Sequence, residues 1–446
     1  MKKFVGIMIM LLGAIMFVAG SASAFDMDEH VSQAANGKGD VVIFPNYVAV
    51  GGWDTKLVVT NTSFTHSVVA KVVVRGAKWS QELLDFFIYL SPADVWVGHL
   101  NWGPNGPRMW SVDGSCRGGS RAGFSGWASE SNPWNCTLSQ VCTDVISLGY
   151  VEVFEAWNGI IVDSSGPVAR PVPKPLIKAA YDAATSSTDF EGVINSLTGH
   201  YEISFGHYPV AGVSGIPATS MFAADRATVL RNYNITDKLT FVETFFGGLN
   251  SRNSLCEVEA ALSKNGLQMP YYALENPLST LHLFNFPTKL TVLADCLFDG
   301  VRSPYFAQNG EYGCIEYGAK FIDLEENSTT TGELPSPIPE EEKDVFCWEL
   351  DFIDFALAKM ADYVYDEGWA HYQFEETTSC LSRADGSIGY DGVPVIAKSI
   401  IMKPGKFMSI IPAAFSDGKV EYGAVEIIDY QWEYAAPGKL PTDYQD

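Results

Sequence analysis

Alternating apolar and polar residues predict β-strands throughout the N-terminal part of the chain. Between residues 68 and 75 the even-numbered positions are all apolar, whereas Lys71 and Arg75 lie on the other parity. This is the pattern of a strand with one face buried and the other facing solvent. Residues 85–90 repeat it. Turn-forming residues separate such runs at intervals of roughly 8–12 residues, a spacing typical of antiparallel β-sandwiches.

The apolar residues change to a helical spacing in one short stretch. Positions from Leu176 to Ala183 and from Phe190 to Leu197 both follow the i, i+3, i+4, i+7 pattern, which predicts two short amphipathic helices. Residues 347–355 fit either a strand or the start of a helix. The chain is therefore predicted to be mainly β, with two or more antiparallel sandwich-like (Ig-like) domains and a short helical insert.

Length and composition give the expected division of the chain. A chain of 446 residues exceeds what one hydrophobic core usually serves, so more than one domain is expected. The predicted segments are a signal peptide at 1–24, an N-terminal β-sandwich at 25–170 with a Trp- and Cys-rich loop at about 101–147, a helical connector at 171–200, a second β-rich domain at 201–324, an exposed acidic and proline-containing loop at 325–344, and a C-terminal β-rich part at 345–446. The last part could complete the second domain.

The first residues have the composition of an export signal. Lys2 and Lys3 provide a basic start, residues 4–20 are apolar, and Ala22 and Ala24 have the Ala-x-Ala spacing of a signal-peptidase site. The alternative is a membrane anchor, but an apolar core of about 17 residues is at the lower limit for a spanning helix. No later stretch is comparably apolar. We expect a protein that is secreted, periplasmic or held at the cell surface, with no integral membrane segment after signal removal.

Acidic residues outnumber basic ones by 53 to 29, which gives a formal net charge of −24 at pH 7. Such a charge repels the phosphates of nucleic acids, so no nucleic acid is expected as a partner. The acidity is compatible with cation binding, although the solubility of an exported protein explains it more simply. Because 47% of the residues are hydrophobic and only 18% are charged, the chain has enough apolar material for a packed core.

All eight cysteines follow the predicted cleavage site. An even number of cysteines in an exported protein favours disulfide bonds, and the lack of any Cys-x-x-Cys pair argues against a zinc ribbon or a thioredoxin-like site. The spacing does not reveal which cysteine pairs with which. The disulfide candidates are Cys116, Cys136, Cys142, Cys256, Cys296, Cys314, Cys347 and Cys380.

Familiar catalytic and metal-binding patterns are missing from the sequence. The seven histidines include no His-Glu-x-x-His motif. Glu152 and Glu155 could form the carboxylate pair of a glycosidase, but their opposite parity on one strand points them apart, so both are expected to face solvent. Residues 383–392 resemble a calcium loop, yet they lack its terminal bidentate Glu and are interpreted as a pair of turns. We therefore expect no catalytic residue, no metal and no cofactor.

Tryptophan is concentrated on the N-terminal side, where eight of the eleven fall within the first 157 residues. Aromatic side chains on an exported sandwich can stack on sugar rings or anchor a protein partner. Alternatively, they pack the long loop onto the sandwich. The candidate ligand-binding residues are the tryptophans of that loop, Trp102, Trp110, Trp127 and Trp134.

Several short motifs are spread over most of the chain. They are Gly39–Pro45, Trp53–Thr55, Val59–Ser63, Leu84–Trp96, Gly149–Val153, Phe286–Lys289 and Glu325–Asn327. In these motifs the sequence resembles a group of uncharacterised exported proteins of anaerobic metal- and sulfur-metabolising bacteria. The resemblance implies export and a β architecture, and it carries no established activity to transfer. The motif Leu84–Trp96 also has a physical interpretation: a core strand, a turn at Ser91 and Pro92 that Asp94 caps, and Trp96 packed beneath it.

The sequence favours an exported cell-surface or extracellular structural or adhesive protein without catalytic activity. Its partners would be copies of itself or another surface protein. In one version residues 40–44 pair as an added strand with a neighbouring subunit, while the simpler alternative places them within their own sheet. The alternative function is a secreted carbohydrate-binding module or carbohydrate-active enzyme that uses the aromatic loop to bind a glycan.

Overall fold

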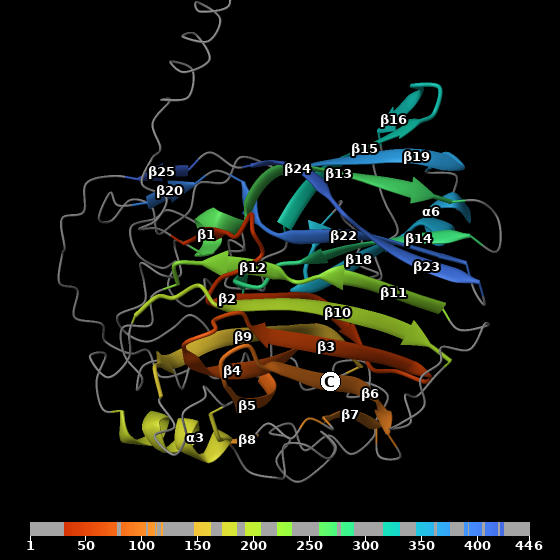
Figure 1. Cartoon of the computed structure of the whole chain (residues 1–446). Coiled ribbons are helices and arrows are strands. Elements are labelled where there is room, and N and C mark those ends of the chain that lie inside the picture. Colours follow the sequence, from red (N-terminus) through yellow and green to blue (C-terminus); the bar gives the residue numbers. More distant parts are fainter. Residues whose placement is uncertain are drawn as a thin grey trace, which may run out of the picture.

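Antiparallel β-sheets dominate the computed structural model of the protein (Figure 1). The structure describes residues 31–77, 82–103, 106–111, 113, 117–118, 147–161, 172–184, 192–206, 221–233, 258–273, 278–289, 315–330, 345–360, 364–374, 388–390, 392–403, 406–417 and 420–422. The prediction of a mainly β protein with antiparallel sheets is confirmed.

Two sheets are built from strands that precede residue 232. Sheet A has the strand order β1 (Ser32–Gln33), β12 (Thr228–Arg231), β2 (Val41–Val48), β9 (Leu148–Gly159), β4 (Ser67–Gly76), β5 (Glu82–Leu90) and β8 (Arg117–Gly118). Sheet B has the order β11 (Met221–Arg226), β10 (Leu197–Phe205), β3 (Trp53–Asn61), β6 (Val95–Gly103) and β7 (Gly106–Trp110).

Two further sheets are built from strands that follow residue 262. Sheet C has the order β16 (Ser328–Thr330), β15 (Ile315–Asp323), β19 (Glu367–Phe374), β13 (Ser263–Tyr272) and β21 (Val393–Pro394), with β17 (Val345–Phe346) also paired to β15 and β24 (Ala414–Asp417) to β13. Sheet D has the order β18 (Leu350–Asp354), β14 (Ser279–Asn285), β22 (Ile396–Lys403) and β23 (Phe407–Pro412). A small ribbon pairs β20 (Ile388–Tyr390) with β25 (Val420–Tyr422).

The four large sheets are arranged like the blades of a propeller rather than as separate sandwiches, so the Ig-like detail of the prediction is not confirmed. Between sheets A and B, Phe44 meets Tyr201 with 6.3 Å between ring centroids, and Ile400 of sheet D belongs to the same core. Between sheets C and D, Phe284 packs edge-on against Tyr372 at 5.0 Å, and the second face of sheet A contributes to this core. Each of these two cores is therefore shared by more than two sheets.

Helix α3 (Lys174–Ala183) forms part of the predicted helical insert and covers the outer face of β4 and β5. Its buried residues Ile177 and Tyr181 build a third, smaller core, in which Tyr181 lies 5.3 Å from Phe87 between ring centroids. The helix lies at the end of the molecule opposite sheet C (Figure 1). Because α3 and the core between sheets C and D cover this face, β4 is buried along its whole length.

The expectation that Lys71 and Arg75 face solvent is therefore wrong. The ammonium of Lys71 lies 3.0 Å from the Asp85 carboxylate, and Arg75 Nε lies 2.7 Å from Glu152 Oε2. Both basic side chains are nearly fully buried. The sequence pattern is that of a half-buried strand, but both faces of the strand are covered in the structure. The charges of Lys71 and Arg75 are neutralised by their acidic partners.

The second helix of the predicted connector is not formed in the described residues. Residues 192–196 have no regular structure, and Leu197 begins β10. Gly192 and Asn195 adopt left-handed φ angles of 83° and 50°, which a right-handed helix does not contain. Strand β10 begins within the predicted connector, and it pairs within sheet B together with β11, while β12 pairs within sheet A; β11 and β12 come from the segment 201–324 that was expected to be a second domain.

Other segments differ in detail from the expectation. The start of the predicted loop at 101–147 is a β-hairpin, because β6 continues to Gly103 and pairs with β7. Residues 328–330 form β16 rather than an exposed loop, and 347–355 contain β18 followed by helix α6 (Phe355–Met360). Residues 40–44 lead into β2, which is paired on both sides by β12 and β9. That segment packs within its own sheet. Because neither edge of β2 is free, it has no edge with which to pair as an added strand with a neighbouring subunit.

Some predictions concern residues outside the described ranges. These are the signal peptide at 1–24, Trp127, Trp134, most of 383–392, and every cysteine except Cys347. Export and disulfide pairing therefore stay predictions. Within the described ranges, no helix is long and apolar enough to cross a membrane.

Candidate functional site

Two acidic residues face each other at one end of the β2–β9 ladder. The backbone N–H of Glu155 donates to the carbonyl of Asp40 at 2.8 Å, directly beside the Val41–Phe154 pair of the two strands. Asp40 and Glu155 are only 1% and 3% exposed. Like charges directly opposite one another destabilise an antiparallel pair, and burial adds to the cost. The pair therefore requires a compensating proton or cation.

A β-bulge in β9 positions Glu155. Against β4, Trp157 pairs with Val69 and Glu155 pairs with Ala70, which leaves Ala156 as the extra residue. As a result, the consecutive residues Ala156 and Trp157 both belong to the small core beneath α3. Bulges commonly re-aim a side chain in this way. The bulge follows Glu155, so Glu152 and Glu155 keep the opposite faces that parity predicts. What the sequence did not reveal is that both faces of β9 are covered.

The expectation that Glu152 and Glu155 face solvent is wrong for both residues. Glu152 is fully buried and bonds Arg75, while Glu155 turns into a separate pocket. The expectation that they do not form a pair holds, since Glu155 has Asp40 as its neighbour instead. Sequence reasoning missed Asp40 because its partner lies on a strand far away along the chain.

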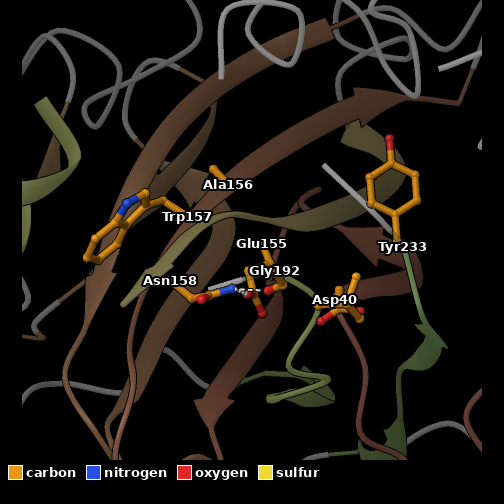
Figure 2. Close-up of a pocket in the computed structure, with 8 residues that line it drawn as sticks. Asp40, Glu155, Ala156, Trp157, Asn158, Gly192 and Tyr233 are labelled. Carbon is orange, nitrogen blue, oxygen red and sulfur yellow. Dashed lines mark hydrogen bonds between the residues drawn. The ribbon is translucent and has the colours of Figure 1, made fainter. Parts of the chain in front are cut away.

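Oxygen and nitrogen atoms from four neighbouring residues surround the two carboxyls. The side-chain amide Nδ2 of Asn158 donates to Glu155 Oε1 and to the carbonyl of Gly192, both at 2.5 Å. Ser196 Oγ donates to Glu155 Oε2 at 3.4 Å, and the backbone N–H of Asn195 donates to Asp40 Oδ1 at 2.8 Å. Figure 2 shows Glu155 between Asn158 on one side and Asp40 on the other.

The segment before β10 is held in place by a reciprocal pair of asparagines. Asn195 Nδ2 donates to Asn232 Oδ1 at 2.9 Å, and the Asn232 backbone N–H donates to Asn195 Oδ1 at 2.8 Å. Both residues have left-handed φ angles, 50° and 62°. Asparagine tolerates this region better than most residues, but such conformations persist only where the surroundings impose them. The fold thus fixes Asn195 and Ser196 against the carboxyl pair.

Burial dominates the electrostatics of the site. It raises the pKa of Asp40 from 3.8 to about 6, although hydrogen bonds led by the Asn195 backbone act in the opposite direction. Burial, followed by the charge of Asp40, raises the pKa of Glu155 well above its usual value. Among the described residues, no Lys or Arg contributes to either pKa. Asp40 Oδ2 is buried and has no hydrogen-bond partner.

Two other buried carboxylates in the described part have a basic neighbour. Glu152 is paired with Arg75. Burial likewise raises the pKa of Asp351 to about 6, but the ammonium of Lys289 acts against that shift. Lys289 also donates to the carbonyl of Cys347. The Asp40–Glu155 pair differs from both because the groups around it are amides, a hydroxyl and a carbonyl.

The cavity between these groups is small. Its volume of about 10 Å³ corresponds to the space that one water molecule needs. Trp157, Val193 and Tyr233 complete the lining. A sugar ring or another organic substrate does not fit, so the pocket can hold a proton, a water molecule or a single ion. In the described ranges there is no group of three or more His, Cys, Asp or Glu residues that could hold a metal.

The described candidate tryptophans lie elsewhere, on the β6–β7 hairpin. Trp102 is half-buried opposite Pro107, and Trp110 stacks on His99 with 4.4 Å between ring centroids and 10° between the planes. His99 in turn lies 3.1 Å from Asp54 Oδ2. Neither tryptophan lines the Asp40–Glu155 pocket.

The chain matches no known protein-family model, no curated protein and no solved structure.

Proposed function

We propose that the protein is an exported cell-surface or extracellular structural or adhesive protein that acts by binding and not by catalysis. The observation that supports binding is an apolar row on the outer face of sheet C. Ile322, Trp369 and Pro270 are direct cross-strand partners on β15, β19 and β13. The side chain of Trp369 is 48% exposed. An Ig-like description of sheets A and B belongs to this proposal, since the two sheets enclose one common core.

The surroundings of this row resemble those of a binding surface. The alternate residues of the same strands, such as Phe321, Ala370 and Met269, are buried in the core, so the sheet has one clear outer face. The row next to the apolar one consists of the polar residues Lys320, His371 and Gln268. A half-exposed Trp flanked by polar groups is typical of a side chain that anchors a partner.

The test is an adhesion experiment with the mature chain from Phe25. Beads coated with the protein should aggregate with one another, and sedimentation velocity should show association that increases with concentration. Trp369→Ala should weaken association by about 30-fold, as removal of an interface hot spot worth about 2 kcal/mol does. Phe407→Ala is the matched control, because Phe407 is similarly exposed at 45% but belongs to sheet D.

The result that contradicts this proposal is equally clear. If beads coated with the wild-type protein stay dispersed and sedimentation shows a monomer at every concentration, the protein does not adhere to copies of itself. Equal losses in the Trp369 and Phe407 variants would show that general surface hydrophobicity, and not the row on sheet C, causes the association.

A carbohydrate-binding module is the second candidate, because Trp102 and Trp110 lie on adjacent strands of an edge hairpin. Trp110 already stacks on His99, which leaves less of its ring for a sugar. We therefore expect no strong signal from the mature protein on a glycan array or in polysaccharide pull-down. A saturable hit that is lost on alanine replacement of Trp102, Trp110, Trp127 or Trp134 would favour this second candidate.

A further inference from the structure

We propose that the Asp40–Glu155 pocket binds one Ca²⁺ ion. The two carboxylates would balance its charge, and neutral oxygens around them would complete its coordination. This is a site beyond the proposed adhesive function, and either can fail without the other.

The donor set fits a hard divalent cation. Ca²⁺ in proteins takes oxygen ligands from carboxylates, backbone and Asn carbonyls, and water. The pocket is lined by the carboxylates of Asp40 and Glu155 and by Gly192, whose carbonyl is an oxygen ligand, and the hydroxyl of Ser196 lies next to it on Glu155. The amide of Asn158 can be turned by half a rotation so that its oxygen faces the pocket, because the two orientations of an amide differ only in the hydrogen bonds they make.

The geometry points to a missing occupant. Asp40 Oδ2 is buried at the pocket and has no hydrogen-bond donor among the neighbouring N–H and O–H groups, and its carboxyl meets the carboxyl of Glu155. Two acceptors that face each other in this way need a proton or a cation between them. Glu155 Oε1 and the Gly192 carbonyl both point at the single nitrogen Nδ2 of Asn158. Several acceptors therefore converge on one small volume, with few donors to serve them.

Charge balance selects the ion. When both carboxyls are ionised they carry two negative charges, which no Lys or Arg of the described residues balances and which one Ca²⁺ would neutralise. A neutral site removes most of the penalty for burying the charges. The cavity holds one such ion without space for a larger ligand. The alternative occupant is a single proton shared by the two carboxyls, which leaves one negative charge in place.

The structure around the pocket is rigid enough to hold an ion. Asn158 Nδ2 donates to Glu155, the backbone N–H of Asn195 donates to Asp40, and the Asn195–Asn232 pair holds the residues before β10. A site with preset ligand positions loses little conformational freedom on binding.

The test uses the whole mature chain from Phe25 after removal of metals with EDTA. Isothermal titration calorimetry should give one bound Ca²⁺ at this pocket, and the thermal unfolding midpoint should rise with Ca²⁺ concentration. Asp40→Asn and Glu155→Gln should each weaken Ca²⁺ binding by at least about tenfold, because each removes one of the two charges. Asp351→Asn is the matched control, since it alters a buried carboxyl next to Lys289 and should leave the affinity for Ca²⁺ unchanged.

Luminescence of Tb³⁺, which replaces Ca²⁺ at oxygen sites, locates the ion. Trp157 and Tyr233 line the pocket, so excitation of these rings should sensitise bound Tb³⁺. Added Ca²⁺ should displace the Tb³⁺ signal. Trp157→Phe should reduce the luminescence, because Tyr233 then remains as the sensitiser.

Three results would overturn the site. One is no Ca²⁺ binding by the stripped wild-type protein, which would leave the shared proton as the occupant. Another is equal Ca²⁺ affinity in wild type and Asp40→Asn, and the third is Tb³⁺ luminescence that added Ca²⁺ does not displace. If Asp40→Asn does not fold, the Glu155→Gln titration and the wild-type Tb³⁺ signal decide the question without it.

Discussion

In the metal-free protein, the buried Asp40 carboxyl should make folding stability fall as the pH rises from about 4 to about 6. Burial raises its pKa from the ordinary value of 3.8 to about 6 in the folded protein. The folded state thus holds the proton more tightly than the unfolded chain. Below about pH 4 the stabilising contribution is fully present, and it is lost as the pH rises through about 6. A difference of this size corresponds to roughly 3 kcal/mol.

The perturbation that isolates this contribution is Asp40→Asn. The variant lacks the titrating carboxyl and also removes the charge that raises the pKa of Glu155. Its stability relative to wild type should therefore increase by about 3 kcal/mol between about pH 4 and pH 7. Urea unfolding followed by tryptophan fluorescence, with EDTA present at every pH, measures the difference. Glu326→Gln, a change at an exposed turn, serves as the control.

The reasoning fails if wild type and Asp40→Asn give parallel stability profiles over this pH range. Parallel profiles would mean that Asp40 titrates alike in both states, despite its burial. A profile with the opposite sign, in which wild type gains on the variant as the pH rises, would mean that a cation stays bound in EDTA or that a basic group reaches the pocket.

Three other perturbations follow from the contacts. Gly39→Ala should lower the thermal unfolding midpoint strongly, because a Cβ there would lie 2.0 Å from the carbonyl oxygen of Leu230; Gly51→Ala, with nothing within 4 Å, should leave the midpoint unchanged. Glu152→Gln should lower the free energy of unfolding in urea by roughly 3–5 kcal/mol, because it leaves the buried charge of Arg75 without its partner; a loss below about 1 kcal/mol would contradict the buried pairing. Alkylation of the unreduced mature protein should modify few of the eight cysteines, and modification of most would reject the disulfide prediction.

Local chemistry made parts of the fold predictable. The turn after β5 is one example: Asp94 Oδ2 accepts a hydrogen bond from the Ser91 backbone N–H at 3.0 Å, as expected from the sequence. Trp96 is fully buried and lies 5.8 Å from Phe86 between ring centroids. Asn61 makes a similar local contact by accepting from the Ser63 N–H at 3.0 Å. In each case the deciding groups are a few residues apart, so the sequence contains the whole interaction.

Long-range packing was beyond the sequence pattern. Alternation in residues 68–75 correctly predicted a strand, but it cannot reveal what covers the second face. That face meets α3 and the core between sheets C and D, which come from later parts of the chain. The buried charges of Lys71 and Arg75 are stable only because Asp85 and Glu152 lie on neighbouring strands. Their burial could be deduced only after the strand order was known.

The candidate site escaped prediction for a related reason. Parity correctly placed Glu152 and Glu155 on opposite faces of β9, because the bulge at Ala156 comes after both residues, but it could not show that both faces are buried. Parity also relates Glu155 only to Glu152, which is on the same strand. The actual neighbour of Glu155 is Asp40, which lies far away in the sequence and is brought beside it by the pairing of β2 with β9. Two like charges at adjacent positions across a ladder are unfavourable in any fold that does not use them. Because this pair is buried and unaccompanied by a basic residue in the described ranges, the cost must be offset either by a proton that the two carboxyls share or by the ion proposed above, and the Ca²⁺ titration separates the two.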